Sequence, residues 1–380
     1  MDGETVMLPS QFNPLAPETV ENPYAFYRAM REHAPVYQVP GAGFFIISRY
    51  ADIMSALNDE ELFSSRQPPG VNINLPPEVA EIYAQGYPPV DTLLTNDPPA
   101  HTRYRVLVTK AFSARRVATL EPKVREIALE LVDRFAREGK VELMDQFAVG
   151  LPLTVIADAL GVPREDMDKF KRWSDDSVAP LGGMILAERQ IECTRSIVEF
   201  QHYFAARLEE RRSAPRDDLL TDLLNARLEG TKPLDTGEML SILQQLLVAG
   251  NETTTNLIGS AMMLLLQHPD QMHTLANDPS LTANFIEEAL RMESPVQGLF
   301  RVTKADAELG GTVIPKMSRI VVMYASGNRD DAQFPGADRF DLRRANAKTH
   351  LAFGQGIHFC IGAALGGWKR DWRSRFCSRE

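Results

Sequence analysis

The stretch Phe353-Gly354-Gln355-Gly356-Ile357-His358-Phe359-Cys360-Ile361-Gly362 indicates the fold of this chain more strongly than any other segment. The two glycines ahead of the cysteine let a loop turn tightly and bring its backbone close to a flat or bulky group. Cys360 precedes an apolar segment, Ile361–Leu365, that is typical of a helix. At a helix start, backbone N–H groups and the helix dipole stabilise a thiolate.

A soft, anionic sulfur presented in this way is a suitable axial ligand for haem iron. The alternative is a structural turn with a buried thiol, the usual state of a single cysteine. Zinc is a poor alternative, because His358 and Cys360 lack the second pair of ligands that a structural zinc site needs. Together with Cys193 and Cys377, Cys360 cannot form a disulfide framework for 380 residues.

The composition is that of an ordinary folded protein, with 44% hydrophobic and 24% charged residues. A net charge of −10 argues against non-specific binding to nucleic acid or to an anionic membrane. The segment Met1–Thr19 is polar and lacks the pattern of a signal peptide. The most apolar long stretch, Leu240–Leu266, contains Gln244 and Glu252 and is too polar for a membrane span. We therefore expect a cytoplasmic protein with neither a nucleic-acid nor a membrane partner.

Apolar periodicity of the helical type dominates the chain, so we expect a mainly α protein with small β-sheets. The longest helix is expected to start at a capping box formed by Asp235 and Glu238 and to end before Pro269. Hairpins are expected over residues 36–48 and 308–323, and a long loop over residues 64–96. The other expected helices, apart from further ones before Asn225, are Asn22–Glu32, Tyr50–Leu57, Ala100–Ala111, Leu120–Glu138, Pro152–Leu160 and Leu281–Met292.

The long helix carries the segment Ala249-Gly250-Asn251-Glu252-Thr253-Thr254 near its middle. An acid inside an apolar helix is costly unless it is used. Threonines that hydrogen-bond to the preceding turn would be a purely structural explanation. That explanation accounts less well for Gly250, because glycine costs about 1 kcal/mol relative to alanine inside a helix.

Two further pairs have helical spacing. His101 and Arg105, at i and i+4, would share one helix face and could bind an anion, and a solvated surface pair is the alternative. Glu288 and Arg291, at i and i+3, could form a buried bidentate ion pair. A solvated pair at this spacing is much commoner, so the second pair indicates little by itself.

The cysteine loop resembles the haem-binding loop of cytochromes P450, which is Phe-Gly-x-Gly-x-His-x-Cys-x-Gly in many bacterial members, and all six specified positions match. The segments 249–254 and 288–291 resemble the family's acid–alcohol and Glu-x-x-Arg motifs, and the segment 97–105 resembles its propionate-binding segment. The resemblance extends from about Asn13 to Leu365. It implies the cytochrome P450 fold as a single large domain over residues 1–365.

By this resemblance the cofactor is haem b (iron protoporphyrin IX), with Cys360 as the ligand of its iron. Four side chains would bind the haem propionates, and four further residues would lie against the haem. The propionate donors are His101, Arg105, Arg301 and His358, and the positions against the haem are Phe353, Gly354, Ala249 and Gly250. Thr253 would hydrogen-bond oxygen at the iron, Glu252 would help to relay protons, and Glu288 with Arg291 would stabilise the fold.

The activity that this resemblance implies is a monooxygenase that inserts one atom of O₂ into an apolar small molecule. We expect electrons to come from NAD(P)H through a separate ferredoxin and its reductase, because no flavin or iron–sulfur motif is present. We also expect a monomer. A peroxide-driven oxygenase is one alternative, although Glu252 and Thr253 argue against it. A catalytically impaired, truncated haem protein is the other alternative.

The family pattern breaks after Leu365. Members continue with Ala-x-Leu-x-Arg-x-Glu, whereas residues 366–380 are rich in Arg and Trp and have no apolar stripe. Codons exist for residues 365–380 in which one added C after the codon for Gly366 gives Leu-Gly-Arg-Leu-Glu-Ala-Gly-Leu-Ala-Leu-Glu-Val-Leu-Leu-Ala-Gly. That reading restores the motif and an amphipathic helix. A frameshift is therefore our hypothesis for this tail.

Overall fold

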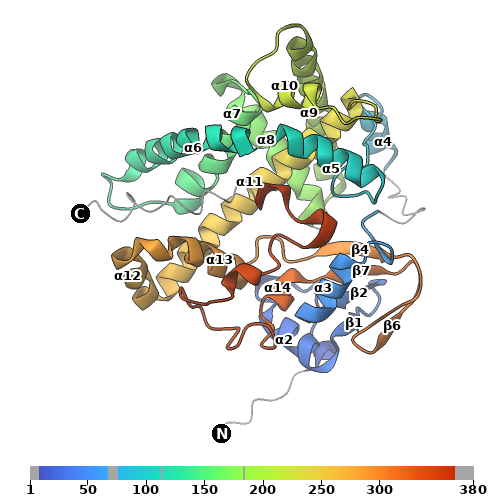
Figure 1. The fold of residues 1–380 in the computed structure, drawn as a ribbon, viewed down its shortest axis with the longest axis vertical. Helices are drawn as coiled ribbons and strands as arrows, with labels where there is room; N and C mark the ends of the chain where they lie inside the picture. Colours follow the sequence, from blue (N-terminus) through green and yellow to red (C-terminus); the bar gives the residue numbers. More distant parts are fainter. Residues whose placement is uncertain (1–7, 67–75, 113, 183–184, 364–380) are drawn as a thin grey trace. The chain divides into compact units, whose positions relative to one another are not determined.

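The structure is a computed structural model, which describes residues 8–66, 76–112, 114–182 and 185–363. It is mainly helical with small sheets, as the sequence predicts (Figure 1). The chain divides into two compact units. Unit 1 comprises Met1–Pro68 and Ser260–Glu380, and unit 2 comprises Pro69–Gly259. The tail after Leu365 lies outside the described residues.

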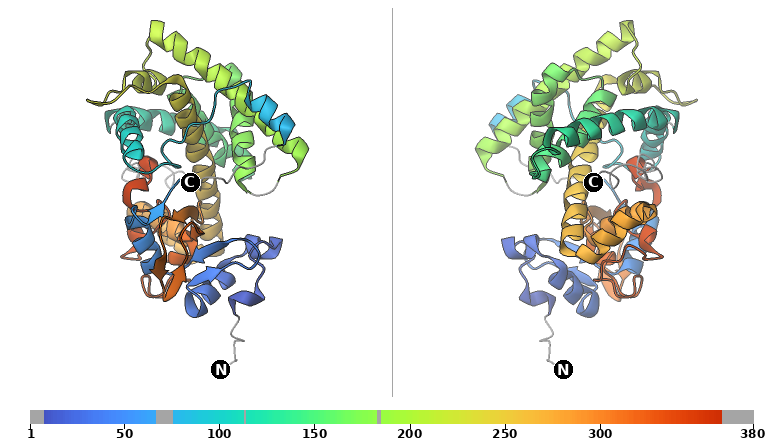
Figure 2. Two further views of the ribbon diagram at one scale, coloured as in Figure 1. Left: turned by 90° about the vertical axis from the view of Figure 1, so that its right-hand side faces the viewer. Right: turned by 90° about the vertical axis from the view of Figure 1, so that its left-hand side faces the viewer.

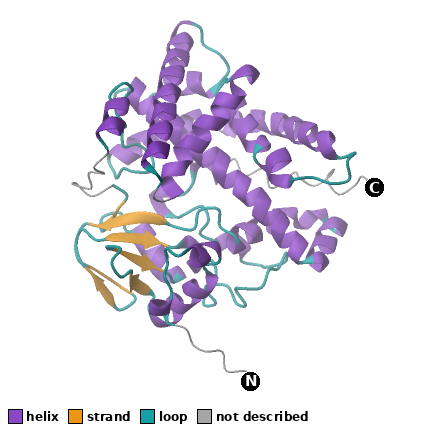
Figure 3. Cartoon of the chain, turned by 180° about the vertical axis from the view of Figure 1, so that it is seen from behind, coloured by secondary structure: helices purple, strands orange, loops and turns teal. Residues whose placement is uncertain are grey.

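The strands of the described chain all belong to unit 1 and gather in one part of the molecule (Figure 3). Strands β2 and β7 are parallel, and the other neighbouring strands are antiparallel. The five-stranded sheet has the order β1 (Val36–Gln38), β2 (Phe44–Ile47), β7 (Arg319–Val322), β4 (Leu299–Thr303), β3 (Phe63–Ser64). Its apolar residues Ile47, Ile320 and Val322 are fully buried, which explains why such short strands are stable.

The hairpin expected over residues 308–323 is only partly confirmed. Strands β5 (Ala307–Leu309) and β6 (Thr312–Ile314) do pair around Gly310-Gly311. The remaining strand, β7, pairs instead with β2 and β4. The prediction was wrong there because alternation along one segment shows that a strand is half-buried but does not show which strand lies beside it.

Helices complete unit 1. They are α1 (Pro17–Glu21), α2 (Tyr24–His33), α3 (Tyr50–Asn58), α12 (Pro269–Asn277), α13 (Thr282–Met292) and α14 (Tyr324–Gly327). Asn22 was expected to open α2, with Pro23 as the first helical residue; the helix begins one residue later, with Pro23 as its N-cap and Tyr24 as its first residue. A hydrophobic core joins α3, β2, β7 and Leu351, which is 1% exposed. This core therefore reaches the segment that leads into the cysteine loop.

The regular secondary structure of unit 2 is all helical in the described residues (Figure 2). Its helices are α4 (Pro77–Tyr83), α5 (Ala100–Ala111), α6 (Ala114–Phe135), α7 (Gly150–Ala159), α8 (Met167–Val178), α9 (Ala187–Ser213), α10 (Leu219–Asn225) and most of α11 (Thr236–Gln267). The expected loop over residues 64–96 was wrong in part, because it contains α4, which packs against α9. No helix in the described ranges is long and apolar enough to cross a membrane.

The predicted capping box at the start of α11 is confirmed. The backbone N–H of Glu238 donates to Oδ1 of Asp235 at 2.9 Å, and the N–H of Asp235 donates to Oε2 of Glu238 at 2.9 Å. The helix ends at Gln267, before Pro269, also as expected. Both ends of the helix that carries the acid–alcohol segment are therefore determined by local sequence.

Candidate functional site

The loop that ends in Cys360 is a closed turn. The backbone N–H of Cys360 donates to the carbonyl of Phe353 at 2.9 Å. Gly354 and Gly356 have φ angles of +66° and +69°, the left-handed region that glycine adopts without strain. A Cβ on Gly356 would collide with the carbonyl oxygen of Leu57 in α3. The two glycines thus serve the tight turn that the sequence predicts, and Gly356 also allows the loop to approach the backbone of α3.

Cys360 is a free, half-buried thiol at the end of this turn. A 3₁₀ turn over residues 361–363 begins directly after it, with the N–H of Ala363 donating to the Cys360 carbonyl at 3.2 Å. The Phe353 and Phe359 rings pack 6.2 Å apart, centroid to centroid, at the two ends of the loop. The sulfur is therefore carried by a backbone-constrained loop with apolar neighbours, which is suitable for a metal-ligating thiolate.

Two of the predicted propionate donors lie in unit 1, near this loop. Nε2 of His358 lies 2.9 Å from the hydroxyl of Ser65. Arg301, on β4, is 6% exposed and hydrogen-bonds to the carbonyl of Phe300 and to the hydroxyl of Tyr324. That hydroxyl lies 3.6 Å from the position that a Cβ on Gly354 would occupy. Arg301 and the cysteine loop therefore share Tyr324 as a neighbour.

Charge balance around Arg301 provides a test of whether an anionic cofactor fits. The Phe300 carbonyl and the Tyr324 hydroxyl are neutral, and within the described ranges no carboxylate forms an ion pair with Arg301. A buried guanidinium without a carboxylate is costly unless an anion is supplied from elsewhere. Burial raises the pKa of Tyr324, with Arg301 opposing it, so this hydroxyl stays neutral and does not supply the charge. The residues present therefore fit a haem propionate.

The other two predicted donors lie in unit 2, on α5. His101 and Arg105 are one helical turn apart, as expected, and His101 is 2% exposed. Burial, and then the positive charge of Arg105, lower the pKa of His101. The imidazole is therefore neutral at pH 7 and can donate one N–H.

The acid–alcohol segment lies on α11, also in unit 2. The hydroxyl of Thr253 donates to the carbonyl of Ala249 at 2.6 Å, which is the back-bonding that the sequence offered as a structural alternative. Oε1 of Glu252 accepts from the amide of Asn256 at 3.2 Å. The helix runs without interruption through this segment.

The protein atoms around Gly250 leave room for a Cβ. A Cβ on this residue would meet the side chain of Ile156 at 3.7 Å, an ordinary contact distance. The neighbouring Asn251 is buried, and its amide donates to the hydroxyl of Ser174 in α8 at 2.8 Å. This buried link between α11 and α8 was not predicted, because nothing in the local pattern identifies its partner.

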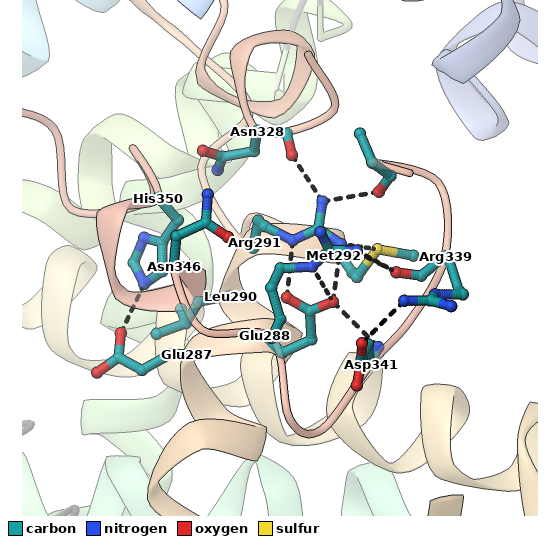
Figure 4. A network of polar contacts seen from close by, with 12 residues as sticks. Glu287, Glu288, Leu290, Arg291, Met292, Asn328, Arg339, Asp341, Asn346 and His350 are labelled. Atoms are coloured by element: carbon teal, nitrogen blue, oxygen red, sulfur yellow. Dashed lines mark hydrogen bonds and ion pairs between the residues drawn. The ribbon is translucent and has the colours of Figure 1, made fainter. Parts of the chain in front are cut away.

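The Glu288–Arg291 pair is buried and bidentate, as one of the two sequence interpretations proposed. Both side chains are 0% exposed, with N–O distances of 2.7 and 2.8 Å (Figure 4). A second arginine, Arg344, was not predicted; its Nε donates to Oε1 of Glu288 at 3.0 Å. Arg344 lies in a polar segment without periodicity, so no sequence signal identified it.

Comparisons with known proteins agree with this description. The family model described as Cytochrome P450 matches residues 186–369. Cytochrome P450 107B1 of Saccharopolyspora erythraea is 40% identical over 361 residues, 89% of this chain and 82% of that protein. The 6-deoxyerythronolide B hydroxylase of the same organism is 37% identical over 351 residues, 90% of this chain and 84% of that protein. The structure of cytochrome P450 CYP109Q5 from Chondromyces apiculatus is 43% identical, with a TM-score of 0.80 over 93% of this chain and 86% of that one.

The fold and the cysteine loop define a haem-thiolate oxidoreductase. The chain belongs to the cytochrome P450 family. It is therefore a monooxygenase with haem b as its cofactor.

Proposed function

We propose that this chain inserts one oxygen atom from O₂ into an apolar small molecule, with Cys360 as the ligand of the haem iron. The closed loop around Cys360 carries this proposal. The hydrogen bond from Cys360 to Phe353 and the left-handed glycines 354 and 356 constrain the sulfur at the end of a rigid turn. A ligand that is held in this way needs little reorganisation when it binds a metal.

Four donors would hold the two haem carboxylates. Arg301 and Arg105 supply positive charge, and His358 and His101 supply directional hydrogen bonds. When it is bound, haem supplies the redox chemistry that activates O₂. Neutral His101 can donate without adding a further positive charge, because its pKa is lowered.

Thr253 and Glu252 would deliver protons. The Thr253 hydroxyl hydrogen now points to the Ala249 carbonyl, and rotation about χ1 would present it elsewhere. Glu252 lies one residue earlier and can replace a proton that the threonine passes on. We also propose a ferredoxin-type electron donor reduced from NAD(P)H, since no flavin or iron–sulfur motif occurs in these 380 residues. A cytoplasmic location and a monomeric state are further parts of the proposal.

Replacement of the thiolate tests the ligand assignment. In the Cys360→Ser variant the reduced carbon monoxide complex should lose the red-shifted Soret band that a thiolate ligand produces. Cys193→Ser is the matched control, because that thiol is buried in α9 and should leave the band unchanged. A folded wild-type protein that binds haem but lacks this band would refute the proposal.

Replacement of the hydroxyl tests proton delivery. Thr253→Ala should lower O₂-dependent product formation by about 10²-fold, the usual size of a lost acid–base contribution, while peroxide-driven turnover is retained. Thr254→Ala, one residue further along the same helix, is the control and should retain activity. Wild-type turnover that is faster with hydrogen peroxide than with reduced ferredoxin would favour a peroxide-driven oxygenase instead.

A further inference from the structure

The segment that leads into the cysteine loop is held by α13 at two places. The first involves the Glu-x-x-Arg arginine. Nη1 of Arg291 donates to the carbonyl of Asn328 at 2.8 Å, and the Asn328 side-chain oxygen accepts from the N–H of Leu351 at 2.6 Å. Leu351 is also part of the unit 1 core. This connection fixes the backbone two residues before Phe353.

The second connection passes through His350, which the family motif does not include. Nε2 of His350 lies 2.9 Å from Oε2 of Glu287 (Figure 4). Nδ1 of His350 accepts from the N–H of Ala352 at 3.1 Å. The His350 side chain is 2% exposed and that of Glu287 is 18% exposed. Because Nδ1 accepts an N–H, the ring proton lies on Nε2 and is donated to the Glu287 carboxylate.

His350 is also joined to the loop by packing. Its ring centroid lies 5.5 Å from that of Phe353, and the Phe353 carbonyl accepts the N–H of Cys360. A shift of the His350 ring would therefore move Phe353, whose carbonyl orients Cys360. Glu287 and Arg291 are at i and i+4, so both connections start from one face of α13.

We propose that His350 is a positioning residue for the Cys360 ligand, with Glu287 as the acceptor that fixes its orientation. The proposal rests on the proposed function, since it concerns the geometry of the same sulfur. It gives the cysteine loop a second hydrogen-bonded support, through His350 and Phe353, besides the connection made by Arg291. Outer groups of this kind usually change the affinity for a bound metal about 10–100-fold when they are removed.

Three variants separate positioning from simple stability. His350→Phe keeps an aromatic ring but removes both hydrogen bonds, and Glu287→Gln keeps a carbonyl acceptor for the ring N–H. Tyr27→Phe is the control, because it removes a half-buried hydroxyl that bonds to Gln297 elsewhere in unit 1. Thermal unfolding of each variant measures the general loss of stability.

The first measurement uses the loaded protein. His350→Phe should release haem to an excess of a haem-acceptor protein about tenfold faster than the wild type. It should also convert more of the reduced carbon monoxide complex to the shorter-wavelength form that lacks the thiolate. Glu287→Gln should lie nearer the wild type, and Tyr27→Phe should match the wild type in both respects. Equal haem loss in His350→Phe and Tyr27→Phe at equal stability would overturn the proposal.

The second measurement needs no haem. Hydrogen exchange in the apoprotein should accelerate about tenfold or more in peptides that cover residues 350–363 of His350→Phe, because both hydrogen bonds of the ring are lost, while β2 and β7 stay unchanged. Unchanged exchange there refutes the role of His350 whatever the cofactor. A wild type that shows the expected protection but no thiolate band would instead refute the proposed function.

Discussion

Gly356 and Gly250 belong to two motifs of the sequence, but the two glycines have different physical roles. Gly356 has a positive φ angle, and a Cβ on this residue would collide with the backbone of Leu57. Gly250 lies in regular helix, with only ordinary side-chain contacts at the same place. The first glycine is required by backbone geometry, whereas the second is not required by packing.

The two alanine variants should therefore change stability in opposite directions. Gly356→Ala should destabilise the protein by about 2–4 kcal/mol, from the left-handed conformation and the collision. Gly250→Ala should stabilise it by about 0.5–1 kcal/mol, because alanine is the better helix former. Chemical denaturation of the apoprotein measures both changes. A destabilised Gly250→Ala would show that α11 needs its glycine for a reason other than space.

Elements are joined by a few buried charges, and the start of α11 shows this most clearly. Glu238 completes the capping box and also accepts from Arg103, at 2.8 and 3.0 Å, and from the hydroxyl of Tyr104 at 3.0 Å. Burial by itself would raise the pKa of Glu238, but the hydrogen bonds from Arg103, Asp235 and Tyr104 lower it to about 2. The carboxylate thus links α5, which carries His101 and Arg105, to α11.

This lowered pKa predicts how stability depends on pH. The carboxylate takes up protons more readily in the unfolded chain, near its ordinary value of 4.5, than in the folded protein. Its contribution to stability is therefore complete above that value and is lost as the pH falls toward about 2. Glu238→Gln should lower the melting temperature at neutral pH and reduce the loss on acidification. Glu126→Gln, an exposed position on α6, should do neither.

At the scale of the whole molecule, the resemblance by sequence motifs extends to Leu365. The family model matches as far as residue 369. By the resemblance, the helix that starts after Cys360 should continue through the residues after Leu365. Residues 366–380 do not have the composition of such a helix.

The frameshift hypothesis predicts what a repaired chain would do. A protein that carries the restored Leu-Gly-Arg-Leu-Glu reading should unfold at a higher temperature and retain haem longer than the chain with the Arg- and Trp-rich tail, because it regains an amphipathic helix. Thermal unfolding and haem transfer measure the two effects. Sequencing the gene provides an independent check, since codons that cannot yield this reading would refute the hypothesis.

Sequence by itself determined the class of the protein, through its resemblance to a family, and singled out Cys360 as the proposed thiolate ligand. The cysteine loop, the capping box of α11 and the spacing of His101 and Arg105 are local patterns, and local backbone physics is sufficient to predict them. The same holds for the bounds of α5, which the periodicity predicted as Ala100–Ala111. Expectations about residues 366–380 and about the roles of Thr253 and Glu252 remain predictions.

Tertiary structure alone decided which distant segments meet. It placed β7 between β2 and β4, brought Arg344 onto Glu288, and set His350 against Glu287 beside the cysteine loop. Spacing along the chain shows which face of an element is buried, but it carries no record of the partner on the other side. These partners are selected by packing and by the need of each buried charge for a counter-charge, which only the folded chain satisfies.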